Sequence, residues 1–182
     1  MKSFKTRNSG KLSLAAALIS TAIMILYAQY VLGYYSRCFW MEEGPNSLGL
    51  LLGYSREDVQ AFLSVRTPEQ IRCYIDFLMK WDFIFPLLYG LMHILWLRYF
   101  FPGMYLLFLI PGFHIGADWL ENVMESGMAE AFLTGEDIGS GLLKWGSLIT
   151  SIKWILSFAT YLILLTGIGL KIKKYLKTRQ TR

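Results

Sequence analysis

Four stretches of predominantly apolar residues divide the chain. They cover approximately residues 12–32, 75–99, 104–124 and 142–170. Each is close to or above the roughly 20 residues that an α-helix needs to cross a bilayer, since each residue adds about 1.5 Å of rise. The pattern predicts an all-α protein, a polytopic membrane four-helix bundle that forms a single integral membrane domain over residues 1–182.

The composition agrees with a membrane location. Of the 182 residues, 54% are hydrophobic, and the mean hydropathy is +0.40. A soluble domain of this size cannot remove so much apolar surface from water. We therefore expect the lipid bilayer to be the main environment of the chain.

The distribution of basic residues predicts an orientation. Lys and Arg gather in residues 1–11 and 171–182, and Arg98 lies in the short turn between the second and third spans. Basic residues that flank membrane spans concentrate on the cytoplasmic side. We thus expect a multi-pass protein of the cell inner (plasma) membrane with both termini cytoplasmic, and with extracytoplasmic segments at residues 33–74 and 125–141. We find no nucleic-acid motif, so the basic tails are interpreted as topology signals.

The first extracytoplasmic segment contains two helix start signals. Ser55 and Asp58 have the spacing of a capping box and precede an apolar face, which predicts a short amphipathic helix near residues 55–65. Thr67 followed by Pro68 combines an N-cap residue with the residue favoured at the first helical position. A second helix is expected to run from Pro68 into the second span.

Cys38 and Cys73 are the two cysteines of the chain, and both fall in this outer segment. A disulfide between them would tie the end of the first span to the start of the second, with a stabilisation of roughly 3–4 kcal/mol in the chain-entropy model. Two unlinked thiols are the alternative. The sequence has no C-x-x-C pair of the kind found in redox enzymes.

Among the charged residues of the predicted spans, Asp82, Asp118, Glu121 and Lys153 are the candidates for a site within the bilayer. A charge in hydrocarbon costs a few kcal/mol or more unless it is paired or hydrated, so such residues mark a candidate functional site. Counted from the expected outer ends of the spans, Asp82 and Asp118 lie roughly 10 Å deep and Lys153 roughly 16 Å deep. The three spans can therefore bring these side chains together.

Helical spacing places each of these residues on a polar stripe of its span. The stripes consist of Asp82, Pro86, Tyr89 and His93; of Pro111, His114, Asp118, Glu121, Asn122 and Glu125; and of Gly146, Thr150, Lys153, Ser157 and Thr160. Because lipid disfavours polar groups, the stripes should face one another around an interior that opens outward.

Three carboxylates against one lysine leave negative charge that protons or a cationic ligand must balance, unless one acid stays neutral. We expect Tyr89 and Asn122 to add neutral hydrogen bonds. The predicted ligand-binding residues are Asp82, Tyr89, Asp118, Glu121, Asn122 and Lys153. No cofactor is predicted.

A metal site is the less favoured interpretation of the same stripe. His114, Asp118, Glu121 and Glu125 have helical ligand spacing, but the sequence has neither a Glu-x-x-His pair nor an H-E-x-x-H motif. The depth count also places His93 near the inner face, away from His114. We therefore predict no metal.

Several of these residues belong to a longer pattern: Arg-x-Tyr before the second span, D-x-x-F-P-x-x-Y within it, D-x-x-E-N in the third span and a lysine in the fourth. The matching residues are Arg72, Tyr74, Asp82, Phe85, Pro86, Tyr89, Asp118, Glu121, Asn122 and Lys153. Over residues 53–157 the chain resembles a family of small uncharacterised bacterial four-helix integral membrane proteins. The resemblance implies the fold and the site but no activity.

Three classes of function remain open. The first is the binding or transport of a cation, a proton or a small lipophilic solute, where transport by so few helices would require a homo-oligomer. The second is a structural or partner-binding membrane subunit whose buried charges lock the helices together. The third is an intramembrane acid/base enzyme, similar to a lipid isomerase. A void of several hundred Å3 beside the charges would favour a ligand, either a small solute or a lipid, over a purely structural role.

Overall fold

The computed structural model describes residues 2–42 and 44–180, with side chains from Gly10 onward. Most of the predicted N-terminal basic tail, residues 1–11, and the last two residues of the C-terminal tail therefore lie outside the described side chains. The described residues are all-helical and include no strand.

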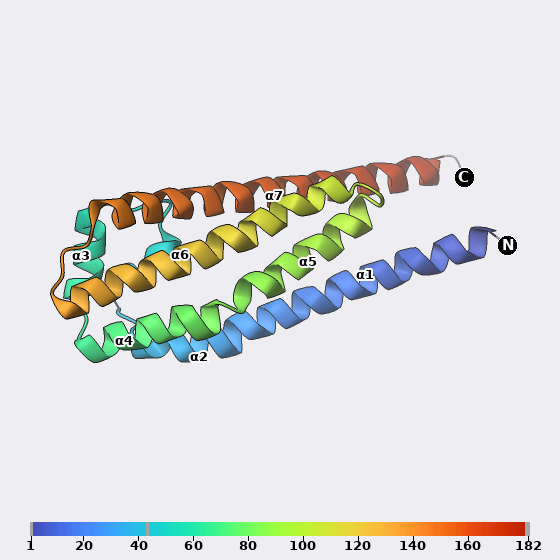
Figure 1. The fold of residues 1–182 in the computed structure, drawn as a ribbon. Coiled ribbons are helices and arrows are strands. Elements are labelled where there is room, and N and C mark those ends of the chain that lie inside the picture. Colours follow the sequence, from blue (N-terminus) through green and yellow to red (C-terminus); the bar gives the residue numbers. More distant parts are fainter. Residues whose placement is uncertain (1, 43, 181–182) are drawn as a thin grey trace.

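Four long helical segments lie side by side (Figure 1). The first comprises α1 (Lys2–Leu26), the π-helical turn η1 (Tyr27–Leu32) and α2 (Gly33–Tyr35). The second comprises α4 (Pro68–Asp76), the π-helical turn η4 (Phe77–Asp82) and α5 (Phe85–Phe100). The third is α6 (Leu109–Thr134) and the fourth is α7 (Ser140–Gln180). Shorter helices connect them: η2 (Ser36–Cys38), η3 (Leu48–Leu50), α3 (Arg56–Ser64) and η5 (Tyr105–Phe108).

The connections separate into two ends of the molecule. The start of α1 and the end of α7 lie at one end, and the turn from α5 to α6 points the same way (Figure 1). We call this the tail end. The opposite end holds α3 and the turn from α6 to α7 (Figure 1). We call it the cap end, and the irregular residues 44–55 that cross it the cap segment.

Three helical runs are long and apolar enough to cross a membrane: Gly10–Cys38, Pro68–Phe100 and Ser140–Gln180. They contain the predicted first, second and fourth spans. The third predicted span corresponds to η5 and the first part of α6. This helix is long enough, but the carboxylates of Asp118 and Glu121 lie in its middle, so its composition alone does not identify it as a span.

The helices extend further than the apolar stretches. α6 continues to Thr134, where Gly135 adopts the left-handed conformation (φ 74°) that commonly ends a helix. The predicted outer segment 125–141 is therefore helical over most of its length, and Glu125 is buried rather than exposed. Hydropathy marks where a chain leaves an apolar environment, whereas a helix continues until its backbone is capped.

Both start signals in the outer segment are present. The Ser55 hydroxyl accepts from the backbone N–H of Asp58, and the Asp58 carboxylate accepts from that of Ser55, so α3 begins directly afterwards. Thr67 forms the same reciprocal box with Gln70 at the start of α4. The apolar face of α3 is buried through Val59, Phe62 and Leu63.

The second segment is broken between η4 and α5. Pro86 has no N–H, and its ring would clash with the carbonyl four residues earlier in a continuous helix. Side chains from other segments satisfy carbonyls at the break: the Tyr27 hydroxyl donates to the Trp81 carbonyl at 2.7 Å, and the Trp119 indole donates to that of Phe83 at 2.9 Å. The break is thus a packed feature of the fold, and Asp82 lies directly before it.

Cys38 and Cys73 lie at disulfide distance, with Cα atoms 6.2 Å apart. The pair joins the end of the first helical segment to α4, so the prediction of a bonded pair agrees with the structure. Beside it, the ring of Phe39 packs edge-on against Tyr74 and Phe77 at 5.0 and 5.1 Å between centroids. The cap end therefore has its own covalent and aromatic core.

Candidate ligand-binding site

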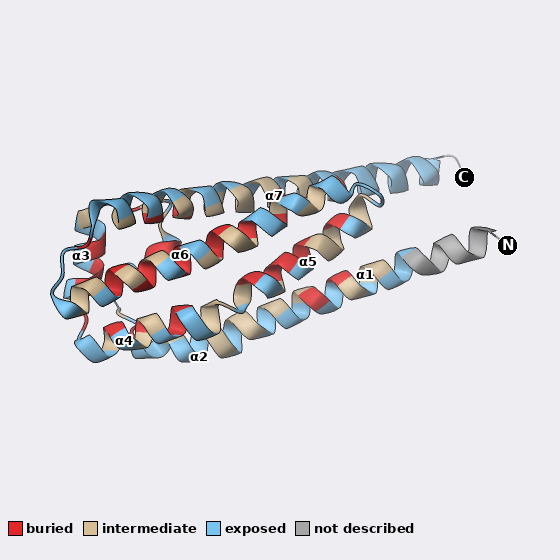
Figure 2. Ribbon diagram, viewed as in Figure 1, coloured by how far each residue is buried: buried red, intermediate tan, exposed pale blue. Residues whose placement is uncertain are grey.

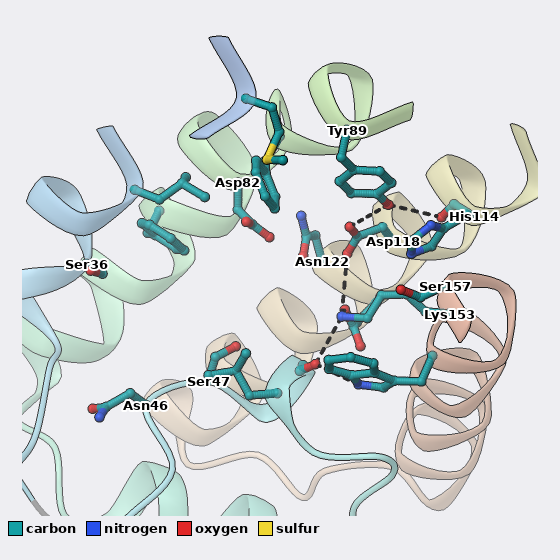
Figure 3. Close-up of a pocket in the computed structure, with 18 of the residues that line it drawn as sticks. Ser36, Asn46, Ser47, Asp82, Tyr89, His114, Asp118, Asn122, Lys153 and Ser157 are labelled. Carbon is teal, nitrogen blue, oxygen red and sulfur yellow. Dashed lines mark hydrogen bonds and ion pairs between the residues drawn. The ribbon is translucent and has the colours of Figure 1, made fainter. Parts of the chain in front are cut away.

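A cavity of about 510 Å3 lies between the four long segments and the cap segment. All six residues predicted from the sequence line it: Asp82, Tyr89, Asp118, Glu121, Asn122 and Lys153. Figure 3 shows the polar groups of Asp82, Tyr89, Asp118, Asn122 and Lys153 gathered around one space, with the first segment on one side and α7 on the other. The lengths of the helices and the spacing of the stripes bring these residues together.

Lys153 is the centre of the charged network. Its ammonium forms an ion pair with Glu121 and lies 3.7 Å from a carboxylate oxygen of Asp118. The same nitrogen donates a hydrogen bond of 3.0 Å to the carbonyl of Gly49 in the cap segment. Lys153 therefore connects α7 with α6 and with the cap.

Glycine at position 49 allows this close approach. A Cβ atom there would lie 2.9 Å from a carboxylate oxygen of Glu121 and 3.2 Å from the Lys153 ammonium. Those separations are too short for the neighbouring atoms to remain in place. The cap segment can thus lie on the ion pair because it presents bare backbone at this point.

Asp118 has a second partner on α5. The Tyr89 hydroxyl donates to an Asp118 carboxylate oxygen at 2.9 Å and lies 3.4 Å from the carbonyl of His114. Asp118 is 7% exposed and Tyr89 6% exposed. The network consequently extends across α5, α6 and α7 in a buried region.

Asp82 differs from the other two carboxylates. It lines the cavity, yet within the described residues no Lys, Arg or His nitrogen lies within 4.0 Å of its carboxylate. Figure 3 shows its carboxylate pointing into the cavity near the amide of Asn122. That amide lies 3.5 Å from the Leu78 carbonyl of η4. Asp82 is thus the carboxylate best placed to meet a bound molecule.

The rest of the wall is largely apolar and aromatic. Its members include Met24, Leu32, Phe39, Trp40, Leu50, Phe77, Phe85 and Trp154. The carboxylates of the cavity belong to η4 and α6, whereas the wall formed by the first segment includes the apolar side chains of Met24 and Leu32. The cavity therefore combines an acidic side with an apolar side.

The two histidines correct an expectation from the sequence. His93 was expected near the inner face and away from His114, but the two ring centroids lie 6.1 Å apart, and both residues line the cavity. α6 continues past the predicted end of the third span to Thr134, which places His114 roughly 30 Å from the end of its helix and at the level of His93. In the described part of the chain, no three His, Cys, Asp or Glu side chains are grouped to hold a metal ion.

A further buried carboxylate was assigned by the sequence to the outer segment. Glu125 is 1% exposed and accepts a hydrogen bond from the Tyr74 hydroxyl. Ser47, which lines the cavity, has its hydroxyl 3.4 Å from that of Tyr74. Burial, followed by the negative charge of Glu125, raises the pKa of the nearby Tyr54 hydroxyl. Glu125 adds a buried carboxyl group behind the cavity. Its place in the polar stripe of the third span was the available signal.

The site combines three carboxyl groups with one lysine, hydrogen-bond donors and an apolar wall around an open volume.

Comparison of the chain with protein-family models, curated proteins and solved structures finds no match. The family resemblance noted from the sequence remains a prediction.

Proposed function

We propose that this protein is a polytopic inner-membrane protein whose intramembrane acidic cavity binds a small organic cation with an apolar part. The observation that carries the proposal is the cavity of about 510 Å3, into which Asp82 presents a carboxylate without a cationic partner among the described residues. Such a volume suits drug-sized ligands, whose pockets span about 300–1,000 Å3.

The charge balance supports a cation. Asp82, Asp118 and Glu121 line the cavity, and Lys153 is the one lysine or arginine among its lining residues. Negative charge is costly at low dielectric unless it is neutralised. A bound ammonium group would pair with Asp82 and bring the cavity closer to neutrality.

The proposal requires α6 to be a fourth crossing, which makes the fold a membrane four-helix bundle. The carboxylates of α6 are turned inward, since Asp118 is 7% and Glu121 1% exposed. Its outward face carries Phe113, Leu120 and Val123, each at least half exposed. A helix with apolar residues outside and charges inside is compatible with lipid on one face and a polar interior on the other.

The arrangement of the two ends supports the proposed orientation. Basic residues of the C-terminal part of α7 lie at the tail end, together with Arg98 near the end of α5. Placing the tail end in the cytoplasm satisfies the positive-inside rule. The cap end, with the amphipathic helix α3 and the Cys38–Cys73 pair, is then extracytoplasmic, where disulfides persist.

A purely structural role accounts for fewer of the observations. The Lys153–Glu121 pair and the hydrogen bond to Gly49 would lock helices and cap in either case. A lock does not require an adjoining void, because protein interiors otherwise pack densely. The open volume beside Asp82 is therefore better explained by a ligand.

Native mass spectrometry of the purified protein tests the proposal. We expect a bound cationic molecule on the wild type, its loss in Asp82→Asn, and its retention in Asp76→Asn. Asp76 is the matched control because it lies on the same helical segment but is exposed and pairs with Lys80 at 3.0 Å. Equal occupancy in both variants would contradict the proposal and favour the structural role. Recovery of a chemically altered product would favour the enzyme alternative.

A further inference from the structure

We infer that the cavity opens sideways into the bilayer between the first helical segment and α7, and that its ligand is a long-chain amine that enters from the lipid. The inference rests on the proposed function and specifies the ligand class and its route. Two observations support it: the first segment and α7 make few contacts with each other, and α7 is in close contact with the cap segment and with α5.

The first segment and α7 form two sides of the cavity, and each packs against α5 or α6 rather than against the other. α1 packs against α5, and η1 packs against η4. α7 packs against α6 and α5. Within the described residues no extensive contact joins α1 or α2 to α7, although both line the cavity. Figure 3 shows Ser36 of η2, directly after the first segment, and Ser157 of α7 on opposite sides of the space.

Both ends of the cavity are covered. At the cap end, the Gly49 carbonyl accepts hydrogen bonds from Lys153 at 3.0 Å and from the Trp154 indole at 3.2 Å. Toward the tail end, α7 approaches α5 so closely that a Cβ on Gly167 would lie 2.7 Å from the side chain of Phe100. These contacts close the gaps between α7 and the cap segment and between α7 and α5, which leaves the gap between the first segment and α7.

The rim of the opening is apolar and runs from the cap end along the side of the bundle. Lining residues that are also exposed mark the rim, and they include Trp40 (55%), Leu50 (65%) and Tyr161 (48%). Tyr161 lies two helical turns beyond Lys153 toward the tail end, roughly 12 Å along the axis. The rim therefore extends to the depth of the acyl chains. Figure 2 shows many exposed residues on the coloured part of α1 and along α7, as expected of lipid-facing helices.

The two faces of the cavity fit an amphiphile with one cationic end. A primary ammonium at Asp82 would donate to its carboxylate, while a hydrocarbon chain would leave past Met24 and Leu32 into the bilayer. A small water-soluble cation would gain nothing from an apolar mouth, whereas each methylene kept out of water contributes about 0.8 kcal/mol. The structure thus favours a lipid-soluble amine over a free ion.

Photolabelling in liposomes tests this route. The probe is octadecylamine with a diazirine in its chain, and the matched control is the corresponding alcohol. We expect the amine to label residues 24–36 and 154–161 at least about tenfold more than the alcohol, the ratio for one charged contact worth about 1.4 kcal/mol. The excess should disappear in Asp82→Asn and persist in Asp76→Asn. Labelling confined to the cap segment, or equal labelling by amine and alcohol, would overturn the inference.

A bulky substitution at the rim tests lateral entry and leaves the charged residues of the cavity unchanged. Gly33 lines the cavity and is exposed, and the nearest atom to an added Cβ would be 3.6 Å away. Gly33→Trp should lower the initial rate of labelling, whereas Gly169→Trp, an exposed position with no atom within 4 Å, should not. Equal rates in the two variants would contradict entry at this rim.

The water-soluble amine phenethylamine separates the inference from the proposed function. If it binds in an Asp82-dependent manner while octadecylamine does not label the cavity, the proposed function stands and lateral entry is wrong. If neither amine binds, both are wrong.

Discussion

The ammonium of Lys153 bonds to the carbonyl of Gly49 at 3.0 Å while it pairs with the carboxylate of Glu121. One side chain of α7 therefore holds both the cap segment and α6. Because all three groups border the cavity, the contact that closes the cap is also part of the charge balance at the site.

Replacement of Lys153 should destabilise the protein strongly. Lys153→Met leaves Glu121 buried without its cation and removes one of the two hydrogen bonds to the Gly49 carbonyl, so we expect a loss of about 3–5 kcal/mol. Unfolding of the detergent-solubilised protein by heat or denaturant measures this. Lys144→Met, at an exposed position of α7, should change stability by less than about 0.5 kcal/mol. Similar unfolding of the two variants would show that the buried pair does not lock the fold.

Two glycines on α7 provide a matched test of helix packing. A Cβ at Gly167 would lie 2.7 Å from Phe100, so Gly167→Ala should cost about 1–3 kcal/mol through overpacking. Gly169 has no atom within 4 Å of the corresponding position, and Gly169→Ala should be neutral or stabilising by up to about 1 kcal/mol. If unfolding measurements show Gly167→Ala to be neutral, α7 and α5 do not meet at this point.

Loss of the disulfide should loosen the cap end. Replacing Cys38 and Cys73 by serine removes a cross-link across a sequence separation of 35, worth roughly 3–4 kcal/mol in the chain-entropy model. The expected result is a lower midpoint of unfolding, with the wild type falling to the same midpoint after reduction. Rapid alkylation of both cysteines in the unreduced, folded protein would contradict the bonded pair.

The capping box of α3 should make this helix sensitive to acid. Hydrogen bonds from the backbone N–H and then the hydroxyl of Ser55 hold the pKa of Asp58 below its usual range. A carboxyl with a lowered folded pKa stabilises the fold above its unfolded pKa and loses this effect as the pH falls through the folded value. Amide hydrogen exchange in residues 59–63 should therefore accelerate below about pH 4, after correction for the intrinsic rate. An equal acceleration in Asp58→Asn would show that another group is responsible.

The sequence predicts the positions of the site residues because helix geometry is regular. A constant rise and the repeat of about 3.6 residues per turn place Asp82, Asp118 and Lys153 at similar depth on facing stripes. The structure brings them to one cavity. The same regularity fails where hydropathy is used to estimate helix length. For this reason Glu125 was assigned to the outer segment, and His93 and His114 were expected apart.

The contacts of the cap segment had no comparable signal. Residues 44–55 lack a helical or strand period, so nothing in their pattern indicates that the Gly49 carbonyl reaches Lys153. The π-helical turns η1 and η4 are also absent from the pattern, as is the hydrogen bond from the Tyr27 hydroxyl of one to the Trp81 carbonyl of the other. Such features depend on contacts between distant residues.

Equilibrium binding tests the central claim most directly. The protein in nanodiscs is titrated with phenethylamine and with phenethyl alcohol, which has nearly the same shape but no charge. The account predicts that the amine binds at least about tenfold more tightly than the alcohol to the wild type and to Asp76→Asn, and that Asp82→Asn removes the difference. Equal affinity of the two compounds for the wild type, or an unchanged preference in Asp82→Asn, would contradict it.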